Sequence, residues 1–344
     1  MTTITYDILF LCEQEVEQCI SYREAIMLVE EAWKKIATKQ ASQFRSKLLE
    51  VGEGLLAYQA GYTEGAQVAA FLIPVFFNNP EKYGLKSSSG LCVLFDPKTG
   101  MPVSVMSAHN FIKQVKTGCA AAVTAKYFAK KDSSKVAIIG AGYQAVGHFL
   151  AMKELYNLEE VRVFDISKEA KEHFAENMGK YGIKILPTNS IEEAMRGSDI
   201  AMTLTTANAP LVKKDWIEEG MLFLRLGTHQ EMEPEVIMVA DKVVVDWWDY
   251  VRTRSEEIAL LLKQGLISQN DLDEKRLIYA ELPEVVAGRR QGRENDAEKI
   301  VSIQLGMSAD YVVLATHVYN RAVEAGMGVK FNLLSGVKGL KTIP

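Results

Sequence analysis

Residues 135–150 read Lys-Val-Ala-Ile-Ile-Gly-Ala-Gly-Tyr-Gln-Ala-Val-Gly-His-Phe-Leu, and this stretch decides the fold. Its first part, residues 136–139, is an apolar and mostly β-branched run, which is the pattern of a buried strand. The run stops at Gly140, and a helix-compatible pattern comes after it. The stretch therefore predicts a strand, a tight turn and a helix in immediate succession.

The small residues of this turn have the spacing of a dinucleotide fingerprint. Gly140 can make the turn without a Cβ clash, and Gly142 lets a pyrophosphate lie against the backbone. Ala145 stands where the third glycine allows a helix to pack on a strand. The start of the helix, which includes Gln144, offers free N–H groups and a partial positive charge to phosphates. Glycine turns are common, so the match gains weight only if the next strand of the chain supports it.

An acidic residue stands at the end of the next predicted strand. Residues 160–164 form that strand and Asp165 ends it. A carboxylate there can accept both ribose hydroxyls of an adenosine and repels a 2′-phosphate, which favours NAD over NADP. Ser167, close by, is a further candidate cofactor contact. The alternative is that Asp165 only caps the helix that begins near Ser167.

Composition describes an ordinary globular protein. The chain has 344 residues, of which 48% are apolar and 24% charged, and it is long enough for two domains. A net charge of −5 gives no basic surface for nucleic acid. The longest apolar run, residues 68–77, is too short to span a bilayer. Without a signal-like start, and with four cysteines lacking metal-ligand spacing, the chain is expected to be cytoplasmic and metal-free.

The two parts of the chain show different patterns. Before the glycine turn, we expect helices at residues 13–20 and 22–39 and strands at residues 6–10, 44–51, 55–59, 68–77, 91–95 and 102–106. After an Ala-rich helix at residues 116–130, we expect strands at residues 160–164, 184–186, 200–205, 222–226 and 242–245, then a helix at 308–325. Strands that alternate with helices predict a parallel, doubly wound Rossmann sheet, whereas the first part predicts an antiparallel, β-rich α+β unit.

Several segments in order resemble the ornithine cyclodeaminase/mu-crystallin family. They are the glycine turn, Lys116-Thr117-Gly118 before the Ala-rich helix, residues 84–96, and Ala280-Glu-Leu-Pro-Glu-Val-Val-Ala-Gly-Arg-Arg-Gln-Gly-Arg293. The resemblance implies a substrate and dimerisation domain (residues 1–115 plus 308–344) into which an NAD-binding Rossmann domain (residues 116–307) is inserted. It also implies a homodimer and a nicotinamide cofactor at the domain cleft.

The resemblance carries a substrate-binding basic trio onto this chain, with departures. Arg45 matches an arginine that binds the substrate carboxylate, although by itself it is typical of a surface residue. Lys116 falls on a second arginine and keeps the charge without the planar fork. Phe71 falls on a lysine and can only stack on an apolar part of a substrate. Lys86 can replace the lost charge, or it is simply an exposed lysine.

Further site residues also follow from the resemblance and from strand ends. His229 falls on the catalytic aspartate of the cyclodeaminases, where an imidazole can still move a proton; the alternative is a histidine that caps the next segment. Thr117 matches a residue near the nicotinamide or the cofactor phosphates. Thr205, Thr206, Ala207 and Leu226 end two strands where open α/β sheets meet their ligands, or they are ordinary strand ends.

These observations favour an NAD-dependent oxidoreductase that acts on a C–N bond of an amine, amino acid or imine. Two other classes stay open. An ammonia lyase of the cyclodeaminase type would recycle NAD internally, and a dinucleotide- or small-ligand-binding protein would have no activity. Because two positions of the cyclodeaminase pattern differ, at Phe71 and His229, the lyase is the weaker expectation.

Overall fold

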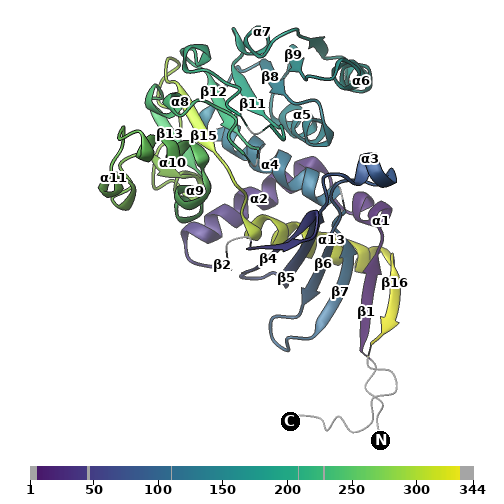
Figure 1. Cartoon of the computed structure of the whole chain (residues 1–344). Coiled ribbons are helices and arrows are strands. Elements are labelled where there is room, and N and C mark those ends of the chain that lie inside the picture. The colour runs from purple at the N-terminus through teal and green to yellow at the C-terminus, as the bar shows by residue number, and fades with distance from the viewer. Residues whose placement is uncertain (1–5, 45–46, 110, 208, 228, 334–344) are drawn as a thin grey trace, which may run out of the picture. The chain divides into compact units, whose positions relative to one another are not determined.

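The computed structural model describes residues 6–44, 47–109, 111–207, 209–227 and 229–333. Its backbone contacts divide the chain into two compact units, both visible in Figure 1. The first unit comprises the described parts of Met1–Ser21, Ala41–Lys113 and Tyr311–Pro344, and the second comprises those of Tyr22–Gln40 and Gln114–Asp310.

The first unit is built on a mostly antiparallel sheet with strand order β16-β1-β7-β6-β5-β4-β2, and β3 also pairs with β4. Its elements are β1 (Asp7–Leu11), α1 (Glu13–Gln18), β2 (Ala41–Gln43), β3 (Lys47–Val51), β4 (Gly54–Thr63), β5 (Val68–Val75), α3 (Asn79–Tyr83), β6 (Leu91–Phe95), β7 (Pro102–Ser107) and β16 (Val329–Asn332). The expected antiparallel arrangement is confirmed except where β1 pairs with β7 in parallel. A hairpin joins β6 to β7, since Asp96 accepts hydrogen bonds from the backbone N–H groups of Lys98 and Thr99.

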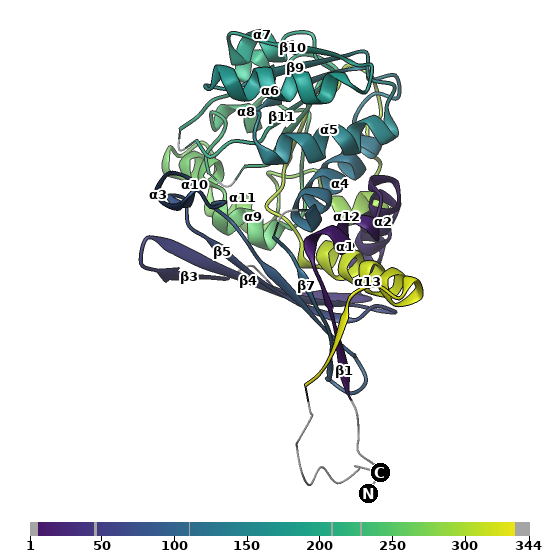
Figure 2. The ribbon, with the colours of Figure 1, turned by 90° about the vertical axis from the view of Figure 1, so that its right-hand side faces the viewer.

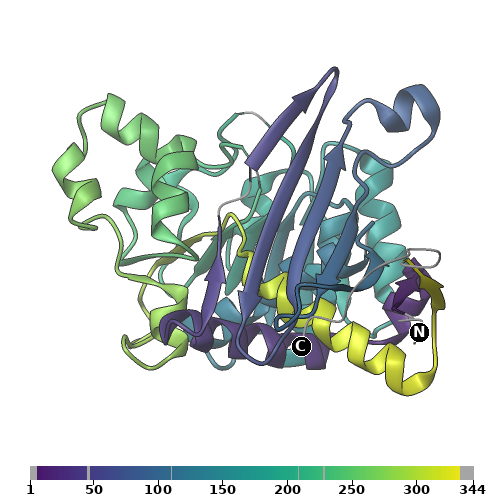
Figure 3. The ribbon, with the colours of Figure 1, turned by 90° about the horizontal axis from the view of Figure 1, so that it is seen from below.

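Helix α13 (Ser308–Ala325) runs across one face of this sheet, as the yellow helix in Figures 2 and 3 shows. Phe71 of β5 packs its ring on Tyr311 of the helix, with ring centroids 4.3 Å apart. The backbone N–H of Gln67 donates to the Thr316 hydroxyl at 3.1 Å. These contacts fix which face of the sheet is covered.

The second unit contains a sheet with strand order β10-β9-β8-β11-β12-β15-β13-β14, and every described pairing in it is parallel. Its strands are β8 (Lys135–Ile139), β9 (Glu160–Phe164), β10 (Lys184–Pro187), β11 (Ile200–Thr203), β12 (Leu222–Arg225), β13 (Lys242–Val245), β14 (Ala280–Glu281) and β15 (Ile300–Ile303). The expected doubly wound Rossmann sheet is confirmed. The sequence prediction missed β14, which has only 2 residues, and β15.

Helices and one 3-10 turn accompany these strands. They are α2 (Tyr22–Ala37), α4 (Phe111–Phe128), α5 (Tyr143–Leu155), α6 (Lys168–Gly179), α7 (Ile191–Met195), η1 (Lys214–Trp216), α8 (Glu235–Met238), α9 (Trp248–Arg254), α10 (Glu256–Lys263), α11 (Gln269–Asp273) and α12 (Leu282–Val286). The central strands β8, β11 and β12 are buried on both faces apart from Lys135, which explains why most of their residues are apolar.

The two units differ from the predicted domain boundaries at one helix. The prediction assigned α2 to the first domain, but its backbone groups with the second unit. The reason is that α2 contacts α5 and α12, and the indole N–H of its Trp33 donates to the Asp310 carboxylate at 2.7 Å. Most of α13, by contrast, groups with the first unit, from Tyr311 onward.

Candidate functional site

The turn after β8 accepts only a glycine. Gly140 has a φ of +101°, and a Cβ built there would lie 2.6 Å from the Leu204 carbonyl oxygen. Its N–H donates to the Phe164 carbonyl at 2.8 Å, which ties the turn to the end of β9. The turn therefore lies among the carboxyl ends of β8, β9 and β11, where open parallel sheets bind ligands.

The helix after the turn has an accessible amino end. Helix α5 begins after Gly142, whose position receives no side-chain cap, and a Cβ at Gly142 would meet no atom within 4 Å. Ala145 is fully buried one turn on. The amino end of α5 thus faces open space at Gly142, and the small residues there permit the close approach of an anion.

Two glycines bring α4 against α5. A Cβ on Gly118 would lie 2.5 Å from the Gly147 carbonyl oxygen, so the two backbones are in contact. This approach lets the Thr117 hydroxyl donate to the Gln144 side-chain oxygen at 2.5 Å. The structure thereby brings together two predicted cofactor contacts, although their positions in the chain did not predict that they would pair.

Asp165 lies beside the glycine turn, as predicted. One carboxylate oxygen accepts the N–H of Ala141 at 2.7 Å, and the other accepts the N–H of Ser167 at 2.9 Å. The Ser167 hydroxyl is itself the cap of α6, since it accepts the N–H of Ala170. Asp165 therefore serves the start of α6 and the nucleotide turn together, and each of its oxygens keeps a lone pair for a ligand hydroxyl.

A buried glutamate that the sequence prediction missed organises the loops after β11 and β12. One oxygen of Glu231 accepts the N–H and the hydroxyl of Thr205, at 2.8 and 2.7 Å, and the other accepts the N–H of Gly227 at 2.7 Å. The Thr205 hydroxyl also accepts the N–H of Ala207. Among the other predicted contacts here, Thr206 is exposed and Leu226 is half-buried. Glu231 thus holds both loops beside the glycine turn.

Behind Glu231 lies a fully buried ion pair between Arg225 and Glu257, 3.0 Å apart. The Arg225 guanidinium also donates to the carbonyls of Gly227 and His229. Glu257 accepts further hydrogen bonds from the Ser255 hydroxyl and the Glu231 N–H. We call Arg225, Glu231, Ser255 and Glu257 the arginine network. An arginine inside an apolar strand was the available signal, because a buried guanidinium needs a partner.

Lys116 lies in a second buried group at the carboxyl ends of β13 and β15. Its ammonium nitrogen is 4.0 Å from an Asp310 oxygen, and both side chains are almost fully buried. Asp246, directly after β13, is buried beside them and accepts the N–H groups of Leu305 and Gly306. We call Lys116, Asp246 and Asp310 the lysine cluster.

His229 is more exposed than Lys116, the other candidate catalytic residue. Its side chain is 40% exposed, and its Nδ1 lies 3.6 Å from the carboxylate of Glu256. Its backbone carbonyl is held by Arg225. The imidazole is therefore accessible to a ligand, while its backbone carbonyl is bound by a buried guanidinium.

The structure gives different outcomes for the residues of the first unit that were predicted to bind substrate. Arg45 lies outside the described residues. Phe71 is only 1% exposed because Tyr311 covers its ring, so the predicted stacking on a substrate is wrong in this structure. Lys86 is exposed.

Lys113, which the sequence prediction overlooked, donates to the Ser88 hydroxyl at 2.7 Å in the same unit. Burial lowers the pKa of Lys113 to about 8, and the charge of Lys86 lowers it further while Glu13 opposes the shift. An amine with such a pKa can exchange protons near neutrality. A lysine in the first turn of a helix carried no signal of this in the sequence.

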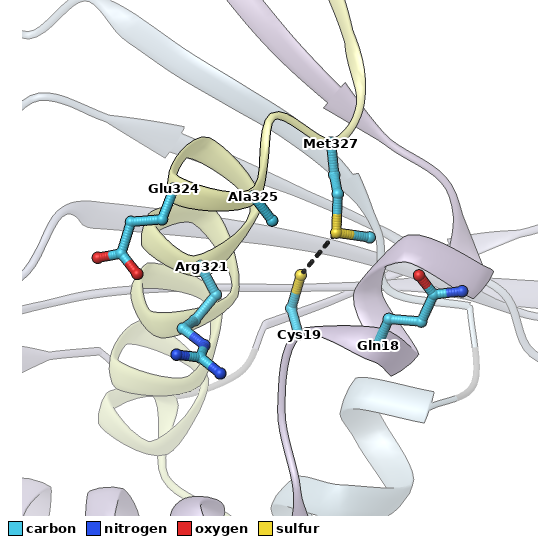
Figure 4. A pocket seen from close by; sticks show the side chains of 6 residues that line it. All are labelled: Gln18, Cys19, Arg321, Glu324, Ala325 and Met327. Carbon is cyan, nitrogen blue, oxygen red and sulfur yellow. Dashed lines mark hydrogen bonds between the residues drawn. The ribbon is translucent and has the colours of Figure 1, made fainter.

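Two hollows of the first unit involve none of the predicted site residues. The one in Figure 4 has a volume of about 300 Å³ and lies between Cys19, Arg321 and Met327. The other, of about 420 Å³, lies between β1, β7 and the end of α13. In the described part of the chain, no group of three or more His, Cys, Asp or Glu residues is arranged to hold a metal ion. No described helix is long and apolar enough to cross a membrane.

Comparison with known proteins gives consistent results. The sequence model of the ornithine cyclodeaminase/mu-crystallin family matches residues 7–326. An alanine dehydrogenase from Archaeoglobus fulgidus is 32% identical over 94% of this chain and 97% of its own length. The structure of Thermococcus litoralis Δ1-pyrroline-2-carboxylate reductase, in complex with NADH and L-proline, is 34% identical and superposes with a TM-score of 0.88 over 94% of this chain and 99% of that one. An archaeal alanine dehydrogenase dimer with bound NAD also gives 0.88, with 31% identity over 95% and 100% of the two chains.

Proposed function

The chain belongs to the ornithine cyclodeaminase/mu-crystallin family, and on that premise we propose that it is an NAD-dependent oxidoreductase acting on the C–N bond of an amino acid, amine or imine. The observation that carries the proposal is the glycine turn with Asp165 beside it. Relatives that are similar over almost the whole chain are an alanine dehydrogenase and a pyrroline-carboxylate reductase.

The residues around the turn fit a dinucleotide. The space in front of Gly142 admits a pyrophosphate to the N–H groups of α5, and the Gly140 position has no room for a side chain. Asp165 can accept ribose hydroxyls and disfavours the 2′-phosphate of NADP. Thr117, Gln144 and the loop at Thr205 complete the cofactor site. When bound, a nicotinamide supplies or accepts the hydride that changes the oxidation state of the carbon bonded to nitrogen.

The protein's own groups would then bind the substrate and manage its proton. Lys116 provides a buried positive charge close to the carboxyl ends of the strands, which suits an amino-acid carboxylate or a developing negative charge. His229 can take a proton from an amine or return it to an imine. Arg45 is proposed, from the resemblance alone, to bind the carboxylate as a bidentate partner.

The proposal is tested by absorbance at 340 nm with NAD and NADP in parallel. Amino acids and amines are assayed in one direction, and cyclic imines or keto acids with ammonia or methylamine in the other. We expect net NADH formation or consumption, with NAD(H) preferred. Ammonia release from ornithine or lysine without net NADH would establish the lyase instead. NADH binding without turnover of any compound would favour a binding protein.

A homodimer formed by the sheet of the first unit is also proposed. Tyr58, Leu72 and Leu91 are directly paired across β4, β5 and β6, so they share one face, opposite to Phe71. They are 36%, 44% and 50% exposed, which makes an apolar row of the kind that partners cover. The archaeal alanine dehydrogenase relative is a dimer.

Light scattering after gel filtration checks this assembly. Leu72→Lys should convert the dimer to monomers, because it places a charge in the middle of the row. Leu266→Lys, at a leucine of the second unit that is 50% exposed, is the matched control and should remain dimeric. A Leu72→Lys protein that stays dimeric would show that another surface forms the interface.

A cytoplasmic location is proposed from the cysteines. All four are free thiols in the structure, and three of them are buried. Proteins exposed to oxidising compartments more often pair their cysteines.

A further inference from the structure

The lysine cluster contains a buried carboxylate that hydrogen bonds satisfy on one side only. Oδ1 of Asp310 accepts the indole N–H of Trp33 at 2.7 Å. Oδ2 accepts no hydrogen bond from the described residues, although it faces the Lys116 ammonium at 4.0 Å. A buried oxygen without a donor costs free energy, so its position calls for an explanation beyond folding.

The other carboxylate of the cluster is fully occupied. Asp246 accepts the N–H of Trp247 at 2.7 Å with one oxygen and the N–H groups of Leu305 and Gly306, at 2.8 and 2.5 Å, with the other. It therefore fixes the loop after β15. Of the two carboxylates, Asp310 is the one with spare capacity to bind Lys116.

The loop after β15 leaves space for the ammonium of Lys116. Gly306 has a φ of +95°, and a Cβ built there would lie 2.5 Å from Nζ of Lys116. Only a glycine can occupy this position without displacing the lysine. The backbone therefore leaves room for the Lys116 ammonium at the carboxyl ends of the strands, where open parallel sheets bind their ligands.

The groups around Asp310 make it the one whose charge changes near neutrality. Burial raises its pKa to about 7, although Lys116 on α4 and the Trp33 N–H on α2 oppose the shift; the charge of Asp246 adds to it. Burial also raises the pKa of Cys119 on α4 well above its usual value and lowers that of His148 on α5 to about 4. Both of these neighbours are therefore uncharged at neutral pH. Burial raises the pKa of Asp246 as well.

We propose that Asp310 is a positioning residue of the reaction, whose ionised carboxylate holds the Lys116 ammonium in place and whose protonation releases it. The proposal rests on the proposed function, in which Lys116 meets the substrate. It deepens that function because the position of the Lys116 ammonium then depends on pH, through a residue that does not itself touch the substrate.

The first test compares pH profiles of kcat/KM. The natural protein should lose activity as the pH falls through about 7. Asp310→Asn keeps an oxygen for Trp33 but cannot ionise. This loss of activity at low pH, the acid limb of the profile, should therefore disappear, and kcat/KM at pH 8 should fall about tenfold or more. The dissociation constant of NADH, measured by fluorescence, should stay within about twofold. Asp273→Asn, at an exposed aspartate, is the matched control and should keep the natural profile. An acid limb that persists unchanged in Asp310→Asn overturns the proposal.

A second variant moves the limb instead of removing it. Trp33→Phe deletes the N–H donor that favours the ionised carboxylate, so the limb should shift to higher pH by about one unit. An unshifted limb in this folded protein would contradict the assignment to Asp310.

A measurement without turnover separates this proposal from the proposed function. In the NADH complex, the 13C signals of the Asp310 carboxyl and of the Lys116 side chain are followed by NMR against pH. Both should change with one midpoint near 7, and the Lys116 signal should lose that transition in Asp310→Asn. A Lys116 signal that ignores Asp310 refutes the coupling, even if the enzyme is active. Coupled signals in a protein without turnover would instead reject only the proposed function.

Discussion

The arginine network and the lysine cluster both lie buried at the carboxyl ends of parallel strands, but hydrogen bonds satisfy them to different degrees. Arg225 donates to Glu257 and to two backbone carbonyls, and both carboxylates of its network accept several donors. The lysine cluster leaves one oxygen of Asp310 without a hydrogen bond from the described residues. A buried ion pair with all its hydrogen bonds made stabilises the fold. A buried carboxylate with an unsatisfied oxygen lowers stability, and proteins tolerate it where a charged group serves catalysis.

The largest expected effect comes from breaking the arginine network. Arg225→Met should lower the free energy of unfolding by about 3–5 kcal/mol, because it leaves Glu257 as a buried, uncompensated charge. Urea denaturation measures the loss. Arg276→Met removes an arginine whose side chain is 58% exposed, and this control should change stability by less than about 1 kcal/mol. Equal effects of the two variants would remove the basis for calling the network structural.

Asp165 is intermediate between the arginine network and the lysine cluster, since each of its oxygens accepts one backbone N–H and its side chain is only partly buried. Asp165→Ser should lower kcat/KM for NAD by about 10–100-fold, with a smaller loss or a gain for NADP, because the ribose acceptor and its repulsion of the 2′-phosphate are removed. Steady-state kinetics with both cofactors give the ratio. Asp132→Ser, at an exposed aspartate, serves as the control. An unchanged NAD/NADP ratio would restrict Asp165 to holding the α6 start.

A smaller effect is expected where the arginine network meets the cofactor loops. A Cβ on Gly227 would lie 2.2 Å from the carboxyl carbon of Glu231, so Gly227→Ala must displace the group that holds Thr205. Affinity for NADH should fall about tenfold, or about 1.4 kcal/mol, as seen by fluorescence titration. Gly179→Ala introduces a methyl group into open space at the end of α6 and should leave affinity unchanged. If both proteins bind NADH equally well, the loop geometry does not matter for binding.

Sequence reasoning predicted the parts of this molecule that depend on local pattern. The apolar run predicted the strand before Gly140, and Gly140 predicted the turn, where only a residue without a Cβ fits. The same strand–helix spacing predicted that Asp165 lies beside this turn. It missed β15, where Ser302 interrupts a short apolar run, and it assigned α2 by its position in the chain instead of by its packing.

The partners of buried charges could not be predicted, since they come from distant segments. Glu257 meets Arg225 and the Glu231 N–H only after segments that are distant in sequence have packed together, and Asp310 is far from Lys116 in sequence. The same limit explains Phe71, whose ring faces Tyr311 from the last long helix of the chain. Periodicity reports that a side chain is buried but not what it meets.

The most direct test of the contrast between the two groups is the unfolding free energy of Asp310→Asn relative to the natural protein from pH 4 to pH 8. A carboxyl whose pKa rises on folding favours the folded state only while it is protonated, so the natural protein should lose stability relative to the variant by about 1.4 kcal/mol per pH unit between about 4 and 7. Above pH 7 the variant should therefore be the more stable protein, although it is the less active one. A variant that is several kcal/mol less stable at pH 8, as Arg225→Met should be, would show that Asp310 is part of the framework and would contradict this account.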